Sequence, residues 1–231
     1  IKTNIMGAQN VIDASIKKKV KKVIALSTDK AASAINLYGA TKLASDKLMV
    51  ASNAYSKPQT CFSVVRYGNV FGSRGSVAEI FLKNIKTKKK LSLTHPSMTR
   101  FNITLPQSVN FVINCFKLMK GGEIYVPKIP SFRVVDLIKA ISGSQKPKVI
   151  GIRPGEKLHE EMISSSDSIN TGEFKNYFCI LKKLERMKIN FKGNNKFQKK
   201  CEDGFSYTSL NNNHYLKLSE LKSLFKEYSK K

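Results

Sequence analysis

The chain has 231 residues, of which 41% are hydrophobic, so it can bury a sizeable core and form one or two domains. Its formal net charge is +25, but lysine supplies nearly all of it, whereas specific nucleic-acid readers use the arginine fork more freely. The lysines lie in short runs, at 17–22, 86–90 and 196–200, without the regular interleaving of aromatic residues that a base-stacking surface needs. This composition favours a solvated lysine-rich surface over a nucleic-acid binder.

The four cysteines stand far apart, and neither a C-x-x-C pair nor a histidine cluster indicates a metal site. They are typical of reduced thiols in a cytoplasmic protein. No apolar run approaches the roughly 18 residues of a membrane span, and no signal peptide opens the sequence. We therefore expect a soluble, cytoplasmic protein without a metal or a membrane anchor.

Residues 1–19 predict an amphipathic helix with Thr3 or Asn4 as its N-cap. Its apolar positions repeat at helical spacing: Ile5, Ala8, Val11, Ile12 and Ile16. Because such a helix needs a sheet to lie on and the first residue is not methionine, we expect the sheet to begin upstream of residue 1.

Residues 23–26 predict a short strand that is buried on both faces of a parallel sheet. A helix over 37–53 and a strand over 62–67 follow, and this strand opens into a glycine-containing loop over 68–75. The alternation of strand and helix indicates parallel βαβ topology and an α/β fold. Ligands of such sheets bind at the carboxyl ends of the strands, so residues 27–30 lie where a site is expected.

A third helix is predicted after Ser76, which forms a capping box with Glu79. Its apolar face would carry Val77, Ile80, Phe81 and Ile85. A strand is predicted over 123–126 and a helix over 134–141. The buried stripe of that helix would be Val134, Leu137, Ile138 and Ile141.

The last third of the chain is less regular. Residues 151–157 predict a loop that leads into another helix, and residues 169–200 are polar, lysine-rich and poorly periodic. A final amphipathic helix is predicted over 216–228, with Leu218, Leu221, Leu224 and Phe225 on its apolar face.

Tyr38 and Lys42 are one helical turn apart, so both side chains project from one face of the predicted helix. An ammonium beside a phenol favours the phenolate, which is the form that acts as a general base. The spacing alone is weak evidence, because eight tyrosines in a lysine-rich chain produce such a pair by chance. It gains weight from residues 27–30, which can bring hydroxyl, carboxylate and amine groups to the same crevice. The alternative for Asp29 and Lys30 is a solvated turn.

These residues resemble a known family. Ser27–Ala32 and Asn36–Lys42 are similar to the inverting UDP-N-acetylglucosamine 4,6-dehydratases, which are extended short-chain dehydrogenase/reductases of the CapD-like polysaccharide biosynthesis type and open pseudaminic acid biosynthesis. Arg66–Val77, Met98–Phe101 and Gly151–Met162 resemble substrate loops of the same family. The resemblance runs from residue 1 to 166, with a weaker similarity over 205–224. Ser33–Ala34 departs from the family's usual Asn-Pro, and Asn102 from its common tryptophan.

The resemblance implies a role for each catalytic residue. Tyr38 would take the proton from the sugar O4 while a hydride leaves C4, and Lys42 would hold the nicotinamide ribose and tune Tyr38. Thr28 would bind O4, Lys30 would remove the C5 proton, and Asp29 would protonate the departing C6 hydroxyl. Either Tyr38 or Lys30 could return a proton to C5 from the opposite face, which inverts that carbon.

The resemblance also implies the binding residues. The cofactor, NADP or NAD, would contact Leu26, Ser27, Tyr38, Lys42 and Asn69. The substrate, UDP-N-acetylglucosamine, would contact Lys30, Asn69, Arg74, Met98, Arg100, Arg153 and Glu156. Three of these are arginines, which suit a diphosphate, and Glu156 would accept hydrogen bonds from the uridine ribose.

The implied architecture is a Rossmann-type doubly wound parallel sheet with a smaller mixed α/β substrate-binding domain. Its first βαβ unit, with the main pyrophosphate site, would be missing, so the polypeptide by itself could be inactive. The predicted domains are the C-terminal half of the NAD(P)-binding domain over 1–75, a substrate-binding region over 76–168 with elements that return to the Rossmann domain, and a lysine-rich C-terminal extension over 169–231. The family implies a homo-oligomer.

Several alternatives stay open. A UDP-sugar epimerase on the same scaffold would leave the C6 hydroxyl in its product. A non-catalytic basic module that binds nucleic acid or an acidic surface has only the net charge in its favour. The choice between NAD and NADP is also undecided, because the discriminating side chain would follow a strand upstream of residue 1.

Overall fold

The computed structural model describes residues 1–56, 58–143, 146–181 and 197–229. Lys196, which begins a predicted lysine run, and residues 182–195 of the predicted polar stretch lie outside the described residues. The chain forms two compact units, each assembled from separate segments. Unit 1 comprises residues 1–67, 106–128 and 161–207, and unit 2 comprises residues 68–105, 129–160 and 208–231. The predicted domain boundaries at residues 75 and 168 stay predictions.

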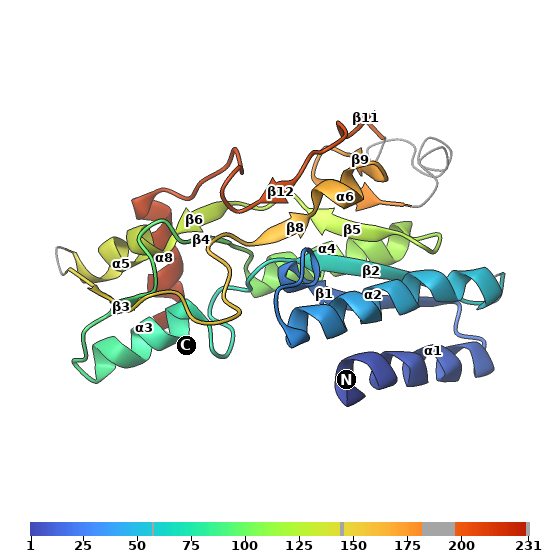
Figure 1. The fold of residues 1–231 in the computed structure, drawn as a ribbon, viewed down its shortest axis with the longest axis horizontal. Coiled ribbons are helices and arrows are strands. Elements are labelled where there is room, and N and C mark those ends of the chain that lie inside the picture. Colours follow the sequence, from blue (N-terminus) through green and yellow to red (C-terminus); the bar gives the residue numbers. More distant parts are fainter. Residues whose placement is uncertain (57, 144–145, 182–196, 230–231) are drawn as a thin grey trace. The chain divides into compact units, whose positions relative to one another are not determined.

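Unit 1 is built around a six-stranded sheet with the order β1-β2-β5-β10-β9-β11 (Figure 1). The strands are β1 (Lys22–Thr28), β2 (Cys61–Tyr67), β5 (Ile124–Pro127), β10 (Tyr177–Ile180), β9 (Thr171–Glu173) and β11 (Lys199–Lys200). The first three run parallel, and β10, β9 and β11 continue the sheet in antiparallel fashion. The register of β1 and β2 pairs Ser27 with Arg66 and Thr28 with Tyr67 at the carboxyl ends of both strands.

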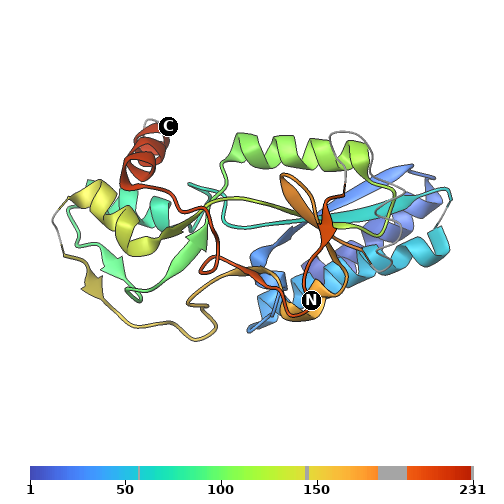
Figure 2. The same cartoon turned by 90° about the horizontal axis from the view of Figure 1, so that it is seen from above.

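Helices cover both faces of this sheet. The remaining elements of the unit are the π-helical turn η1 (Lys2–Met6), α1 (Gly7–Lys17), the 3-10 turn η2 (Asp29–Ala31), α2 (Leu37–Ser56), α4 (Leu105–Leu118), β8 (Glu161–Ile163), α6 (Ser165–Ser168) and, at the unit boundary, β12 (Tyr207–Thr208). Val65 of β2 packs with Cys115 of α4, whereas the next residue, Arg66, pairs with Asp46 of α2. Figure 2 shows α4 and α2 on opposite sides of the strands. The predicted α/β, Rossmann-type doubly wound fold is confirmed.

Unit 2 is smaller and has a mixed α/β structure. It contains α3 (Val77–Lys86), β3 (Ser92–Leu93), β4 (Thr99–Phe101), β6 (Ser131–Arg133), α5 (Val134–Ser142), β7 (Lys148–Val149) and α8 (Leu218–Ser229). β3 pairs with β7 and β4 with β6. Its hydrophobic core joins Phe81 of α3, Leu137 of α5 and Leu221 of α8.

The long predicted elements are confirmed: the helices over 37–53, 134–141 and 216–228, and the strands over 62–67 and 123–126. The buried stripe of α5 is also confirmed, since its predicted members lie in or against the core of unit 2. The capping box is confirmed in part. Ser76 Oγ accepts the Glu79 N–H, but the Glu79 carboxylate accepts the N–H of Gly75 rather than that of Ser76.

The cap predicted for the first helix is wrong. The helical conformation already begins at Lys2 in η1, and no side chain caps either η1 or α1. The Asn4 side chain makes a different contact, because its Nδ2 donates to Thr41 Oγ1 of α2 at 3.0 Å. Val11, one of the predicted apolar positions of this helix, has an exposed side chain on α1.

The prediction that β1 is buried on both faces is wrong as well. β1 lies at the edge of the described sheet with β2 as its neighbour, and Leu26 is 49% exposed. Three residues predicted on the apolar faces of later helices are also exposed: Ile80 and Ile85 of α3 and Leu218 of α8. The loop over 151–157 leads into the strand β8 rather than a helix.

In its described residues, the polar stretch over 169–200 contains three strands that the sequence did not reveal, β9, β10 and β11. Residues 177–180 are all buried in β10, and β9 lies beside them. Among the helices that the structure describes, none combines the length and the apolar character needed to cross a bilayer.

A fully buried arginine ties the elements of unit 1 together. Arg66 donates to Asp46 of α2 at 3.2 Å, to the main-chain oxygen of Met162 at 3.0 Å and to Asp167 at 3.4 Å. Ser27 of β1 donates to the same Asp46 oxygen at 2.8 Å. Burial raises the pKa of Asp46, and the neighbouring Arg66 charge and the Ser27 hydrogen bond oppose that rise. The strand end and the helix are therefore joined through one charged centre.

We expect Arg66→Met to destabilise the protein by about 3–5 kcal/mol at neutral pH, because it leaves Asp46 charged, buried and without its cation. The pKa of Asp46 should then rise further above its unfolded value. The native state would bind the extra proton, so the deficit shrinks as the pH falls through the folded pKa and is largest above it. Urea unfolding across the pH range measures both effects.

The matched control is Arg133→Met, because Arg133 is exposed. Its free energy of unfolding should stay within about 0.5 kcal/mol of the wild type at every pH. An Arg66→Met protein as stable as this control would contradict the role given to the buried network.

Candidate functional site

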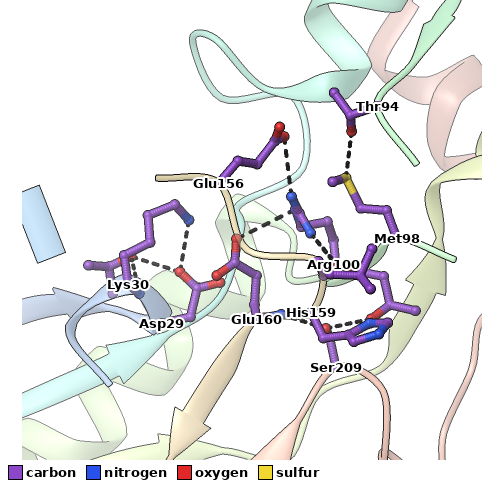
Figure 3. Close-up of polar contacts among 12 residues, drawn as sticks. Asp29, Lys30, Thr94, Met98, Arg100, Glu156, His159, Glu160 and Ser209 are labelled. Atoms are coloured by element: carbon purple, nitrogen blue, oxygen red, sulfur yellow. Dashed lines mark hydrogen bonds and ion pairs between the residues drawn. The ribbon is translucent and has the colours of Figure 1, made fainter. Parts of the chain in front are cut away.

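The carboxyl end of β1 and the turn η2 carry three polar residues that contact one another. Thr28 Oγ1 donates to Asp29 Oδ1 at 2.9 Å, and the Lys30 ammonium donates to the same oxygen at 2.9 Å. Figure 3 shows the Lys30 side chain turned toward Asp29. Asp29 is fully buried, whereas the Lys30 side chain is 34% exposed. The other carboxylate oxygen, Asp29 Oδ2, has no hydrogen-bond partner among the described residues.

The first turn of α2 lies directly against η2 because Gly39 has no side chain. A Cβ atom at Gly39 would sit 2.3 Å from the carbonyl oxygen of Lys30, which no real Cβ contact allows. Asn36 fixes the start of the helix by accepting the Gly39 N–H on its side-chain oxygen at 2.9 Å. This close approach brings the residue after Tyr38 onto the backbone of Lys30.

Tyr38 and Lys42 follow on α2. The Lys42 ammonium donates to the carbonyl oxygen of Leu26 at 2.7 Å, which ties the helix to the end of β1. Tyr38 is 50% exposed. The predicted convergence of the strand end and the helix start is therefore confirmed, and the catalytic and cofactor roles of these residues stay predictions.

A second polar group lies in unit 2 around Arg100. Its guanidinium is 3.5 Å from carboxylate oxygens of both Glu156 and Glu160 (Figure 3). It also donates to the carbonyl oxygens of Thr99 at 2.7 Å and Leu158 at 3.1 Å. Arg153 joins this group through its backbone, because its N–H donates to Glu156 at 3.2 Å. The structure thus brings together three of the predicted substrate-binding residues.

The other predicted substrate-binding residues of unit 2 are placed differently. Arg74 is exposed in the loop over 68–75. Asn69 opens the same loop, and its side-chain oxygen is buried without a partner among the described residues. Met98 lies in the core of unit 2, where its sulfur accepts from Thr94 Oγ1 at 3.0 Å. Its placement gives no support to a contact with substrate, which stays a prediction.

Two features beside these groups were not found from the sequence. Asp46 lies eight residues after Tyr38 and four after Lys42, so the continued helical spacing on α2 was the available signal. The other is a chain in unit 2 in which Thr99 Oγ1 contacts His159 Nδ1 at 2.8 Å and Ser209 Oγ at 2.7 Å. Burial, together with the charges of Arg100 and His95, lowers the pKa of His159. Nothing in the sequence pairs these three residues.

No group of three or more histidine, cysteine or acidic side chains in the described parts of the chain is arranged to hold a metal ion.

Comparisons with known proteins show the family of this chain. Residues 1–182 match the family model described as polysaccharide biosynthesis protein. The chain belongs to this family. It is 54% identical over 227 residues to an inverting UDP-N-acetylglucosamine 4,6-dehydratase from Campylobacter jejuni strain 81-176, a match that covers 96% of this chain and 68% of the relative. Against the enzyme of the same name from strain NCTC 11168, the chain covers 65% of the relative's length.

A solved structure extends the likeness to three dimensions. The X-ray structure of Pen from Bacillus thuringiensis superposes with a TM-score of 0.83 at 36% identity, and the match covers 97% of this chain and 67% of Pen. The family relatives also include a UDP-glucose 4-epimerase from Rickettsia canadensis, which is 43% identical over 185 residues, or 78% of this chain and 54% of the relative. The chain therefore spans between about half and two thirds of the length of these proteins.

We expect Gly39→Ala to lower the free energy of unfolding by about 1–3 kcal/mol, because the new methyl group must push α2 away from the Lys30 carbonyl. Gly7→Ala is the matched control, since Gly7 is also helical and a Cβ there would meet its nearest atom at an ordinary 3.7 Å. That change should stabilise the protein by about 0.5–1 kcal/mol through helix propensity. Urea unfolding followed by circular dichroism compares the two. Equal shifts in both variants would contradict the tight contact at Gly39.

Proposed function

We propose that this chain acts in a nucleotide-sugar dehydratase that converts UDP-N-acetylglucosamine to a 4-keto-6-deoxy sugar with inversion at C5. The observation that carries the proposal is the buried Asp29, whose one oxygen is held by Thr28 and Lys30 while the other has no partner among the described residues. A carboxyl group in that setting suits a proton donor. The 54% identity to inverting dehydratases points to the same reaction.

Elimination of water needs an acid and a base at the same time. Asp29 and Lys30 share a hydrogen bond of 2.9 Å, so moving one proton across it converts the ion pair to a carboxylic acid beside a neutral amine. In that form, Lys30 takes the proton from C5, and Asp29 gives its proton to the C6 hydroxyl, which leaves as water. These two transfers leave an ammonium on Lys30 and a carboxylate on Asp29, so the pair is back in its starting ion-paired form.

Tyr38 completes the proton balance. It takes the O4 proton as the C4 ketone forms, and the ketone makes the C5 proton acidic. Inversion requires that C5 receive its new proton on the face opposite to the base that removed the old one. Since Lys30 is that base, Tyr38 is the better donor, and giving the proton to C5 restores its phenolate. Thr28 would bind O4 during both steps.

The cofactor of the proposed reaction is NADP or NAD. When bound, it accepts the hydride from C4 and returns it to C6. The residues present fit this role, because a half-exposed phenol and an amine stand one turn apart on α2 and the amine is already fixed on the carbonyl of Leu26. Lys42 would hold the ribose, with Leu26, Ser27 and Asn69 as further contacts.

Unit 2 would bind the nucleotide part of the substrate. We propose that Arg74, Arg100 and Arg153 bind the diphosphate, for which arginine forks are suited, and that Glu156 accepts from the uridine ribose. Asn69 has a buried amide oxygen without a partner among the described residues, which supports a contact with a bound ligand.

The proposal also includes a cytoplasmic, homo-oligomeric protein. The four cysteines lie among the described residues and are all free thiols, which suits a reducing compartment. Light scattering on purified protein tests the oligomeric state.

One assay separates the proposal from its alternatives. Incubation of the full-length protein with UDP-N-acetylglucosamine and either cofactor should give a product that has lost one water, as seen by mass spectrometry. A product of unchanged mass would identify an epimerase, as the Rickettsia relatives suggest. Tight, salt-dependent binding of duplex DNA without turnover would favour the basic module.

Lys30→Ala should lower kcat by about 10²-fold or more, because the base for C5 is lost. The affinity for UDP should not change, since Lys30 is not among the residues proposed to bind the nucleotide. Lys47→Ala is the control, because Lys47 is an exposed lysine of α2 and has no proposed role. A normal kcat in Lys30→Ala would refute the assignment.

A further inference from the structure

The C-terminal helix α8 contacts the loop over 68–75 through the aromatic ring of Tyr228. Gly72 has a φ of +75°, and a Cβ atom there would lie 2.3 Å from Cε2 and 2.4 Å from Cδ2 of Tyr228. The ring therefore lies directly on the backbone of Gly72. Only glycine combines this backbone conformation with so close a contact.

The neighbouring residue makes a second contact with the same ring. Phe71 and Tyr228 meet edge to face, with ring centroids 6.1 Å apart and an interplanar angle of 86°. Two successive loop residues thus pack against a side chain that is far away in the sequence. Both contacts lie within unit 2.

The helix that carries the ring is packed into the core of unit 2. Leu221 of α8 is fully buried in the core of unit 2, and Phe225, which precedes Tyr228 by almost one helical turn, packs against the same core. On its other flank the loop is fixed to the segment after β4, since the Phe71 N–H donates to the Ile103 carbonyl oxygen at 2.8 Å. A Cβ at Gly68 would lie 2.4 Å from that of Phe101, so this end of the loop is packed as tightly.

Arg74 follows the loop residues that Tyr228 and the segment after β4 hold in place. It is exposed between Gly72 and Gly75, and a Cβ at Gly75 would meet no atom within 4 Å. The Ser73 N–H donates to the Val70 carbonyl oxygen at 3.1 Å and closes the turn through Gly72, and the next turn, which carries Arg74, is closed by the Ser76 N–H on the Ser73 carbonyl oxygen at 2.9 Å. The backbone of Gly72 leads into the turn that carries Arg74, and the Tyr228 ring packs on this backbone.

We propose that Tyr228 is a positioning residue that orders the Gly72 turn and so presents Arg74 to the diphosphate of a nucleotide ligand. This inference rests on the proposed function, in which Arg74 binds the diphosphate. Without the ring, the turn must be ordered when the ligand binds, and the entropy of that ordering is subtracted from the affinity. The chemistry of unit 1 involves no atom of this turn, so kcat should be unaffected.

The test compares variants of the full-length protein by calorimetric titration with UDP and by steady-state kinetics. Tyr228→Ala should weaken UDP binding and raise KM by about 3- to 10-fold at unchanged kcat. Tyr228→Phe should restore both values, because the contacts with Gly72 involve ring carbons. Tyr55→Ala, at an exposed tyrosine of α2, is the control and should leave both values as in the wild type.

A second variant approaches the contact from the other side. Gly72→Ala should reproduce the loss of UDP affinity without any change in α8, which keeps the test decisive if Tyr228→Ala does not fold. A double-mutant cycle with Arg74→Ala then tests the route of the effect. If Tyr228 acts through Arg74, its removal should have little further effect in the Arg74→Ala background.

The outcomes that overturn the inference differ from those that overturn the proposed function. Normal UDP affinity in Tyr228→Ala or Gly72→Ala, a failure of Tyr228→Phe to rescue, or fully additive effects in the cycle would each overturn the positioning role while UDP binding by the wild type stands. A wild-type protein that does not bind UDP would overturn the proposed function, and this inference with it.

Discussion

The buried charge of Arg66 is the interaction on which the arrangement of unit 1 depends. A guanidinium without solvent contact must keep its anions, so Asp46 and Asp167 cannot move away without a large cost. Asp46 in turn holds Ser27, the residue before Thr28. The end of β1, the helix α2 and the segment that follows β8 are thereby fixed relative to one another. The polar residues at 28–30 and 38–42 are held in a fixed arrangement because they lie on or directly after these elements.

Close packing at glycine completes the positioning that the charges begin. Gly39 lets α2 rest on the Lys30 carbonyl, and Gly68 and Gly72 let their loop rest on Phe101 and Tyr228. In each case a methyl group would overlap with an atom of the neighbour. Contacts of this kind leave the backbone little room to shift, because a close-packed interior has few voids. Both units therefore hold their candidate site residues by contacts that tolerate no larger side chain.

The sequence predicted those parts of the molecule that follow from periodicity and topology. The helix α2 and the strand β2 are long and regular, and parallel strands place their carboxyl ends at one edge, so the convergence of Lys30 with the start of α2 could be foreseen. The exposure of Val11 and Leu26 could not, because it depends on which elements lie beside them. β10 was missed since four apolar residues in a lysine-rich stretch give no clear period. The contact of Tyr228 with Gly72 joins residues that no local pattern relates.

The three arginines proposed to bind a diphosphate are not equivalent. Arg100 is mostly buried and lies between Glu156 and Glu160, so its charge is already balanced by two carboxylates. A diphosphate that approaches Arg100 would have to compete with Glu156. A ribose beside the diphosphate would remove this competition, because its hydroxyl groups would donate to Glu156. Arg74 and Arg153 are exposed and bring their charge without this competition. In the proposed role, Arg100 would suit recognition of the whole nucleotide, because a ribose that binds Glu156 would remove one of its two carboxylate partners, whereas the exposed pair would attract any anion.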